Sequence, residues 1–384
     1  MWRRFVDWQR DLGARTLERG RVIAGNAVAL LIEGIETYPA MLAAIAAAEH
    51  SVVLTSYIFA ADATGARFRD ALAAAARRAV RVRVLVDGFG SFATSAGFFA
   101  PLVEAGGALA VYRPPIPWRH RWGFWRRDHR KILVVDEDTA FIGGLNIGDD
   151  YAPLAEGGRG WHDTHAVVRG PAATVLARLV NRTWRQVTGD SFVGRAGPVA
   201  DAGRVRVQVL ENRFGERARI RRAHRRAFRH ATTSICITNS YFIPGRSIRR
   251  ALLLAARRGV RVQLLLAGRT DLPAVRYASR ALYSRFMHAG IEIYEWTENV
   301  LHAKTAVVDG RWCSIGSANM DHRSVRHNLE ANIVAVDEAL GLQLQHAFRA
   351  DLARALRIDR DSWHRRPALD KMLEQLFYKL RFLL

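Results

Sequence analysis

The sequence predicts an α/β protein of two pseudo-symmetric domains, each a mixed β-sheet flanked by helices, with one active site at their interface. Three observations lead to this prediction. Helix-like and strand-like segments alternate in the same order in both halves, which is typical of a sheet with helices on its faces. One polar motif occurs once in each half, and a length of 384 residues suits two domains.

The duplication is clearest in a helix, turn and strand segment of each half. Residues 71–88 (ALAAAARRAVRVRVLVDG) align without gaps on residues 251–268 (ALLLAARRGVRVQLLLAG), at an offset of 180 residues. Both stretches read as an amphipathic helix followed by a buried strand. Apolar strands ending in SYIF at 56–59 and SYFI at 240–243 precede them.

Agreement over several elements in one order exceeds what a composition rich in alanine and arginine gives by chance. We therefore divide the chain into two repeats, with the boundary near residues 197–203. Residues 1–200 form the first repeat, with an amino-terminal helix. Residues 201–384 form the second, with a carboxy-terminal amphipathic helix.

Each repeat carries the motif H-x-K-x-x-x-x-D. The predicted catalytic set consists of its members, His129, Lys131, Asp136, His302, Lys304 and Asp309. A small residue and an asparagine follow 15 and 17 residues after each histidine, as Gly144 and Asn146 or as Ser317 and Asn319. Only four of the 58 basic residues are lysines, and two of these four lie in the motifs. Arginine evidently does not serve there.

Strand geometry separates the motif positions. Residues two apart on a strand point to the same side, so histidine and lysine share a face, while Asp136 and Asp309 have the opposite parity. We expect the aspartates to secure the structure around the site. Asp309-Gly310 and the looser residues 136–138 predict turns into return strands at 139–142 and 312–315.

Two imidazoles with two lysines suit attack on a phosphodiester. One imidazole forms a phosphohistidine while the other protonates the departing alkoxide. The lysines, with a substrate-binding set of Asn146, Asn319, Ser317 and Gly144, are expected to hold the phosphoryl oxygens. Two adjacent ammonium groups repel a cation, so we expect no metal and no cofactor. The histidines need different protonation states, for which Asp163 and Glu330 are the candidate orienting carboxylates.

These residues resemble the phospholipase D superfamily, whose members pair two such motifs between two similar α/β domains. Within it, the surroundings are similar to bacterial cardiolipin synthases, notably in SYFIP at 240–244, LHAK at 301–304, GSAN at 316–319 and NLE at 328–330. Residues 25–34, TSYIF at 55–59 and VDG at 86–88 are similar to the subtype without amino-terminal spanning helices. The resemblance implies that His129 is the nucleophile and His302 the acid and base. It also implies that one phospholipid loses its head group to the enzyme and that phosphatidylglycerol then accepts the phosphatidyl group.

The net charge of +22 favours polyanionic partners. We expect an anionic phospholipid membrane, with phosphatidylglycerol and a second phospholipid or a glycerol acceptor as substrates, and we rank nucleic acid below these. No apolar run reaches the roughly 18 residues that a spanning helix needs, which predicts a peripheral protein on the cytoplasmic face of the bacterial inner membrane. The phosphatidyl donor and the oligomeric state depend on surface shape rather than on motif chemistry.

Three segments are candidates for contact with lipid. Residues 113–127 (RPPIPWRHRWGFWRR) combine tryptophan and arginine, which suits a lipid interface or a solvated basic loop with its tryptophans folded back. The tail beyond Pro367 has apolar residues at helical spacing, which pack on the protein body more often than on lipid. The same alternatives apply to residues 2–17.

Other functions are compatible with the motifs. Water as the acceptor makes the enzyme a phospholipase D hydrolase, and a superfamily nuclease also suits the positive charge. A catalytically silent membrane or nucleic-acid binding module ranks last, because all six motif residues are present.

Overall fold

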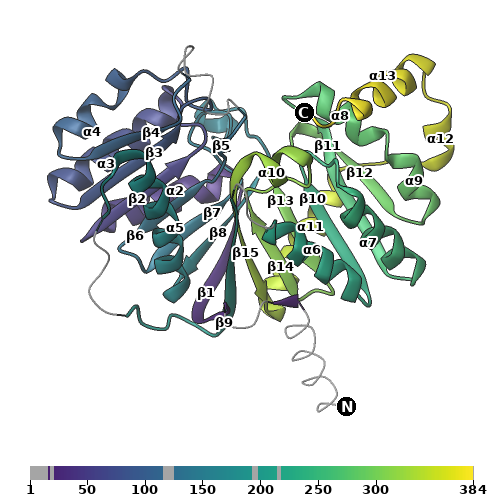
Figure 1. Ribbon diagram of the computed structural model, residues 1–384, viewed down its shortest axis with the longest axis horizontal. Coiled ribbons are helices and arrows are strands. Elements are labelled where there is room, and N and C mark those ends of the chain that lie inside the picture. The colour runs from purple at the N-terminus through teal and green to yellow at the C-terminus, as the bar shows by residue number, and fades with distance from the viewer. Residues whose placement is uncertain (1–15, 18–20, 116–124, 193–197, 214–217, 384) are drawn as a thin grey trace.

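The structure is a computed structural model that describes residues 16–17, 21–115, 125–192, 198–213 and 218–383. Most of the amino-terminal run at 2–17 and residues 116–124 of the tryptophan- and arginine-rich segment lie outside the described residues. The chain forms two α/β halves side by side, purple to blue and green to yellow in Figure 1, with β1 and β9 between them.

The same types of element follow one another in both halves. The first half contains β1 (Ile23–Ile32), α2 (Glu33–Ala47), β2 (Ser51–Ser56), α3 (Ala63–Arg77), β3 (Arg81–Asp87), α4 (Ala100–Glu104), β4 (Ala108–Tyr112), β5 (Arg127–Asp128), β6 (Ile132–Val135), β7 (Thr139–Gly143), β8 (Thr164–Arg169) and α5 (Pro171–Thr188). The second half contains β9 (Val205–Asn212), α6 (Arg219–His230), β10 (Ser234–Asn239), α7 (Arg246–Arg257), β11 (Arg261–Arg269), α8 (Pro273–Arg280), α9 (Tyr283–His288), β12 (Glu292–Val300), β13 (Lys304–Val308), β14 (Trp312–Gly316), α10 (His322–Arg326), β15 (Asn328–Val336), α11 (Glu338–Arg354), β16 (Leu356–Arg357), α12 (Arg360–His364) and α13 (Ala368–Lys379).

Strand order repeats the duplication that the sequence predicts. From the edge to the centre, the first half reads β4-β3-β2-β6-β7-β8-β1, and the second reads β12-β11-β10-β13-β14-β15-β9 with β16 added outside. The pairs β2–β3 and β10–β11 are parallel, whereas β6–β7 and β13–β14 are antiparallel hairpins. Because β1 and β9 pair antiparallel at the centre, one mixed sheet runs through both halves. The predicted α/β fold class is confirmed.

Helices cover both faces of this sheet. In the first half, α2, α3 and α4 bury their apolar sides in one cluster with β2 and β3, while α5 lies in a second cluster. In the second half, α6 and α7 cover one face, and α11 belongs to the same cluster as α5. That shared cluster joins Leu176 and Val180 of α5 with Leu344 and Phe348 of α11 through strands of both halves. A common apolar core therefore fixes the halves relative to each other.

The predicted return strands are confirmed as β7 and β14. The turn before β7 has positive φ at Asp136 and Glu137, and the turn before β14 has positive φ at Asp309 and Gly310. Two consecutive positive φ values make the tight turn whose twist suits a hairpin. Aspartate and glycine tolerate this conformation, which explains Asp136 in the first turn and both residues of the second, but not Glu137.

The carboxy-terminal helix predicted from apolar spacing is α13. It lies against α8 at the outer corner of the second half (Figure 1), where Tyr277 and Phe377 stack with ring centroids 5.8 Å apart. Within the ranges that the structure describes, no helix combines the length and apolar character needed to cross a bilayer.

Candidate active site

The two motif histidines are held by backbone bonds that cross between the halves. The backbone nitrogen of His129 donates to the carbonyl oxygen of Leu329 at 3.0 Å, and that of His302 donates to the carbonyl oxygen of His162 at 2.7 Å. His129 follows β5, and His302 precedes β13. The two backbone hydrogen bonds between the halves are equivalent by the internal symmetry. Both imidazoles are buried beside the same interface.

Each imidazole also contacts a carboxylate of the opposite half. Nδ1 of His129 lies 3.1 Å and 3.2 Å from the two carboxylate oxygens of Glu330. Nδ1 of His302 lies 2.6 Å from Oδ2 of Asp163. These carboxylates come directly after Leu329 and His162, the residues whose carbonyls receive the histidine backbones. The two candidate orienting residues thus meet the two histidines, and Nε2 of each ring is left for chemistry.

The two carboxylates have different surroundings. Glu330 also accepts hydrogen bonds from Ser317 Oγ at 2.5 Å, Ser324 Oγ at 2.9 Å and Asn328 Nδ2 at 3.1 Å. Asp163 accepts, besides its histidine, the backbone nitrogen of Thr164 at 2.6 Å. More donors therefore share the charge of Glu330 than share the charge of Asp163.

Gly144 and Ser317, two members of the expected substrate-binding set, lie against the orienting carboxylates. The hydroxyl of Ser317 is occupied by Glu330. A Cβ atom on Gly144 would lie 2.2 Å from Oδ1 of Asp163, so glycine leaves the space in which that carboxylate sits. Both residues are thus placed to position the orienting carboxylates.

The pKa values of both imidazoles are shifted in the direction that favours the neutral form. Burial, with the lysine charges, lowers the pKa of His129 to about 4 although Glu330 opposes the shift. Burial and Lys304 lower the pKa of His302 as well, although its hydrogen bond to the Asp163 carboxylate opposes the shift. Burial raises the pKa of Asp163, but Lys304 and His302 outweigh it and keep the pKa of this carboxyl below its usual value.

The motif lysines are buried and face the same group of charges. Lys131 Nζ donates to the carbonyl of His129 at 2.7 Å, and Lys304 Nζ donates to the carbonyl of His302. Burial lowers the pKa of Lys131 to about 7 and that of Lys304 to about 8, although Glu330 and Asp163 oppose the shift. A bound phosphate anion stabilises both ammonium groups, because it adds negative charge next to them.

The two asparagines are held differently. Asn319 Oδ1 accepts from Ser240 Oγ at 2.7 Å, and no hydrogen bond within the described residues engages its Nδ2. Asn146 Oδ1 accepts from the backbone of Ile58, while its Nδ2 donates to the hydroxyl of Tyr151 at 2.7 Å. Asn319 can therefore offer its amide to a ligand directly, and Asn146 contacts a tyrosine that lies 3.3 Å from Nδ1 of His302.

Asp136 and Asp309 hold backbone at some distance from the imidazoles and the motif lysines. Asp136 lies five residues beyond Lys131, roughly 16 Å along an extended strand. Its carboxylate accepts the backbone nitrogens of Glu49, His50 and Ser51 at 2.7–2.9 Å. Asp309 binds residues 232–234 in the same way. Each aspartate fastens the chain before β2 or β10, as the strand parity predicts.

Aromatic side chains around the imidazoles complete the site. The ring of Tyr57 lies 4.9 Å from that of His129, and the ring of Tyr241 lies 6.4 Å from that of His302. Both tyrosines belong to the Ser-Tyr pairs that occur in both halves. That repetition is the sequence signal for their place in the site, although the two motifs do not include them. Tyr151 and Trp161, which have no counterpart in the motif pattern, pack on His302 and line a cavity of about 520 Å³.

A buried ionic cluster lies next to this site. His162 Nδ1 is 2.6 Å from Glu33 and its Nε2 is 3.0 Å from Asp351, so the imidazole joins carboxylates of both halves. Its ring stacks on Trp296 at 4.4 Å. Burial lowers the pKa of His162, but the hydrogen bonds to Asp351 and Glu33 outweigh burial and raise it to about 9. His162 is therefore protonated at neutral pH and connects the halves beside His302.

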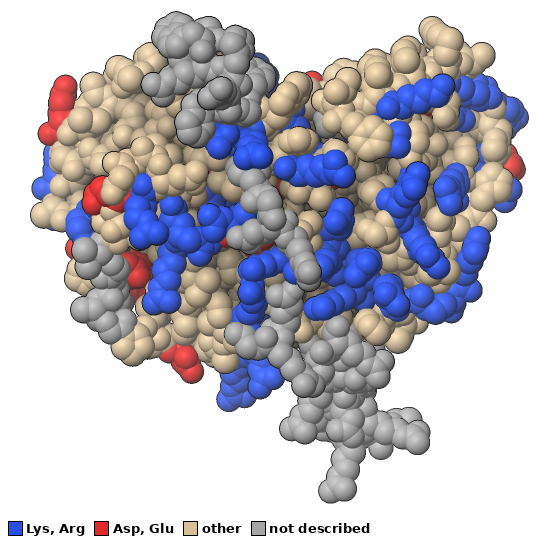
Figure 2. Space-filling model, viewed as in Figure 1, with Lys and Arg blue, Asp and Glu red and all other residues tan. Residues whose placement is uncertain are grey.

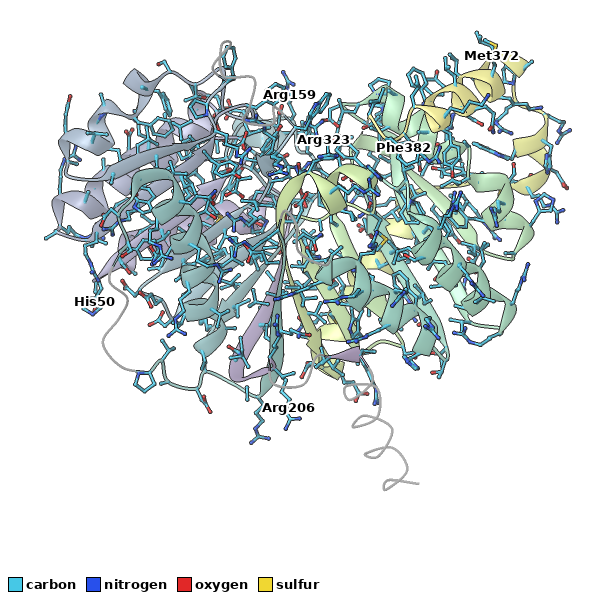
Figure 3. The ribbon with its side chains drawn as sticks, viewed as in Figure 1. His50, Arg159, Arg206, Arg323, Met372 and Phe382 are labelled. Atoms are coloured by element: carbon cyan, nitrogen blue, oxygen red, sulfur yellow. The ribbon has the colours of Figure 1, made fainter. Side chains whose placement is uncertain are left out.

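Electrostatics around the site favour anions. Across the described ranges, no three histidine, cysteine, aspartate or glutamate side chains are grouped so that they could hold a metal ion. Figure 2 shows lysine and arginine spread over the viewed face, densely over the half that carries α6 and α7. Figure 3 places Arg159 and Arg323 at the upper edge of the molecule, between the two halves.

Comparison with known proteins gives consistent relatives. The family profile described as "Cardiolipin synthase, PLD-like domain" matches residues 41–156 and 225–352, one stretch in each half. The chain is 33% identical over 362 residues to "Cardiolipin synthase" of Geobacillus kaustophilus, covering 92% of this chain and 72% of that protein. It is 34% identical over 342 residues to "Cardiolipin synthase B" of Escherichia coli, covering 86% and 81%.

A solved structure shares the whole architecture. The crystal structure of phosphatidylserine synthase from Haemophilus influenzae superposes with a TM-score of 0.74 at 14% identity, covering 98% of this chain and all of that one. Polyphosphate kinase from Porphyromonas gingivalis is similar with a TM-score of 0.58 at 17% identity, over 87% of this chain and 49% of that one. At such identities these structures support the fold alone.

Proposed function

The chain belongs to the cardiolipin synthase family of PLD-like proteins, and from this premise we propose how its two histidines transfer a phosphatidyl group. The chain is a phosphatidyltransferase that makes cardiolipin. In our proposal a phospholipid first gives its phosphatidyl group to one histidine, and a hydroxyl of phosphatidylglycerol then takes it. The observation that carries this mechanism is the pair of imidazoles whose Nδ1 atoms are held by carboxylates of the opposite halves.

His129 is the proposed nucleophile. Its low pKa keeps the ring neutral, and the hydrogen bond to Glu330 keeps the proton on Nδ1, so the lone pair of Nε2 faces the phosphorus. As the bond from Nε2 to phosphorus forms, the bond from phosphorus to the head-group oxygen breaks. The three further donors on Glu330 weaken its pull on a proton at His129, which suits a nucleophile rather than an acid.

His302 is the proposed acid and base. A phosphodiester in the site offsets the charges of Lys304 and Lys131, raises the pKa of His302, and lets it carry a proton that Asp163 stabilises. His302 gives that proton to the departing head-group alkoxide. In the second half-reaction it takes a proton from the hydroxyl of phosphatidylglycerol, whose oxygen attacks phosphorus while the bond to His129 breaks.

Lys131, Lys304 and the amide of Asn319 are the proposed ligands of the phosphoryl oxygens. They lie on both sides of the interface and present fixed donors to charge that spreads over the equatorial oxygens in the transition state. Asn146 contributes through Tyr151, which it orients toward His302.

We propose an anionic membrane as the setting, with the protein peripheral on the cytoplasmic face. The net charge of +22 attracts anionic lipid, and both substrates reside in the bilayer. Phosphatidylglycerol is the proposed acceptor, and a second phospholipid is the proposed donor.

The test is incubation of the purified protein with phosphatidylglycerol vesicles in EDTA, followed by separation of the lipids. Cardiolipin is expected as the product, and it should be lost in both His129→Ala and His302→Ala. Phosphatidic acid instead of cardiolipin would assign a hydrolase. Cleavage of plasmid DNA in a parallel reaction, without a lipid product, would assign a nuclease. Complete loss of activity in EDTA would contradict the proposed role of the lysines.

A further inference from the structure

Helix α13 packs on the protein through polar and aromatic side chains. Its Glu374 is fully buried and forms a 2.5 Å ion pair with Arg366. Phe377 stacks on Tyr277 of α8, and the hydroxyl of Tyr378 accepts a hydrogen bond from Arg249 of α7. Glu374, the one buried residue of α13, therefore lies on the side of the helix that faces the body.

The outward side of α13 is apolar. Its side chains recur at intervals of three or four residues and remain exposed by 42–65%, namely Leu369, Met372, Leu376, Leu380 and Leu383. We call these five residues the α13 stripe. A helix on the surface of a soluble protein normally turns such a stripe toward the core. Here the helix has the reverse orientation, and nothing in the described part of the chain covers the stripe.

The carboxy-terminal end of the stripe lies close to residues of the candidate active site. Phe382, at its end, packs against His322 of α10 with ring centroids 4.9 Å apart, and His322 follows Asn319 by three residues. In Figure 3, Met372 lies at the outer tip of the second half, and Phe382 lies between it and Arg323 at the centre. Leu272, 45% exposed, follows Asp271, which binds the hydroxyl of Tyr241 beside His302.

Basic side chains flank the stripe. Lys371 and Lys379, the two lysines outside the motifs, belong to α13, and Arg381 follows the helix. Apolar residues with adjacent cations on an exposed helix are typical of a segment that lies in the interface of an anionic bilayer. Contact with a second copy through this face would bring the same cations of two +22 chains together. The charges therefore favour lipid as the occupant.

We propose that the α13 stripe inserts into the surface of an anionic phospholipid bilayer and turns the active-site edge toward the membrane. The inference rests on the proposed function, because the substrates lie in that bilayer. The inference names the surface through which the enzyme reaches its lipid substrates. The helix is joined to α8 by Phe377 and to α7 by Tyr378, so insertion of the stripe sets the orientation of the whole protein.

The experiment compares a stripe variant, Met372→Gln/Leu376→Gln/Leu380→Gln, with a matched control. The control, Val103→Gln/Leu342→Gln/Leu356→Gln, changes apolar side chains of similar exposure, 52–57%, outside the stripe. Partitioning onto vesicles of phosphatidylglycerol, with phosphatidylcholine vesicles as the neutral arm, is measured by flotation. Each interfacial side chain contributes on the order of threefold, so the stripe variant should partition roughly 30-fold more weakly, or about 2 kcal/mol.

Activity separates this inference from the proposed function. The stripe variant should keep its melting temperature and its turnover of phosphatidylglycerol dispersed in detergent, while its turnover on vesicles falls with binding. Equal binding by the stripe variant and wild type overturns the inference, even if cardiolipin is made. An equal loss of binding by the control variant also overturns it. A dimer that becomes a monomer only in the stripe variant, measured by light scattering, assigns the face to a second copy instead.

Discussion

Glu330→Gln removes the negative charge opposite His129 while changing the size of the side chain very little. The carboxylate accepts from four side chains, which are His129, Ser317, Ser324 and Asn328. A carboxamide has one acceptor oxygen, so at least one of these contacts must change. If the new amide group faces His129, it donates to Nδ1 and moves the ring proton to Nε2. In that tautomer Nε2 has no lone pair with which to attack phosphorus.

The size of the effect follows from these contacts. Loss of a charge-assisted hydrogen bond costs about 1.5–3 kcal/mol, and the unfavourable tautomer adds a cost of similar size. Together these amount to about 4 kcal/mol, so kcat should fall by about 10³-fold. KM should change by less than about threefold, because Glu330 orients the nucleophile rather than binding the lipid.

The assay is a single turnover with labelled phosphatidylglycerol, in which formation of the acid-labile phosphatidyl-enzyme is followed by quenching. Since Glu330 raises the pKa of His129, the variant should move the acidic limb of the pH profile to lower pH. Glu295→Gln is the control, because Glu295 is equally buried and paired with Arg280, away from the histidines. A kcat within fivefold of wild type, or the same loss in the control, would refute the reasoning.

Three further outcomes are expected. Gly144→Ala should lower kcat at least tenfold by displacing the carboxylate that holds His302, whereas Gly97→Ala, whose added Cβ meets nothing closer than 3.8 Å, should not. The raised pKa of His162 adds stability that is complete below pH 6.5 and lost as pH rises through about 9. Urea unfolding should therefore show a loss of on the order of 3 kcal/mol between these values, absent in His162→Gln. Asp136→Asn should lower the melting temperature by several degrees yet leave kcat within about threefold. A large loss of kcat in the folded variant would assign Asp136 a part in catalysis.

Much of the fold follows from local sequence patterns. The aligned helix and strand segments, the Asp309-Gly310 turn and the two motifs depend on short-range periodicity, and the structure contains all of them. The strand parity of Asp136 and Asp309 also indicates that they face away from the histidines, in agreement with their backbone contacts. The orientation of α13 is different, since the spacing of its leucines is the same whether they face the body or the solvent.

The pairing of carboxylates with histidines could not be predicted from the sequence. Asp163 and Glu330 are recognisable as candidates, but each contacts the histidine of the other half, across 139 and 201 residues of chain. These contacts depend on the crossing of backbones at Leu329 and His162, which is a property of the assembled interface. Only packing of the two halves determines which carboxylate reaches which ring.

The exchange of carboxylates also offers a physical basis for the different roles that we propose for the two motif histidines. Asp163 is one carbon shorter than Glu330, and Gly144 leaves it room to approach His302 at 2.6 Å. In the second half, Ser317 stands at the position equivalent to Gly144. Its side chain fills the corresponding space, and its hydroxyl donates to the longer Glu330. In the proposed mechanism, Asp163 therefore directs its charge at the ring that carries a proton. Glu330 divides its charge among hydroxyl and amide donors and mainly orients the neutral ring. In the proposed mechanism the difference between acid and nucleophile lies in these two pairs of residues, Gly144 with Asp163 and Ser317 with Glu330. Because each pair faces the histidine of the other half, the mechanism needs both halves.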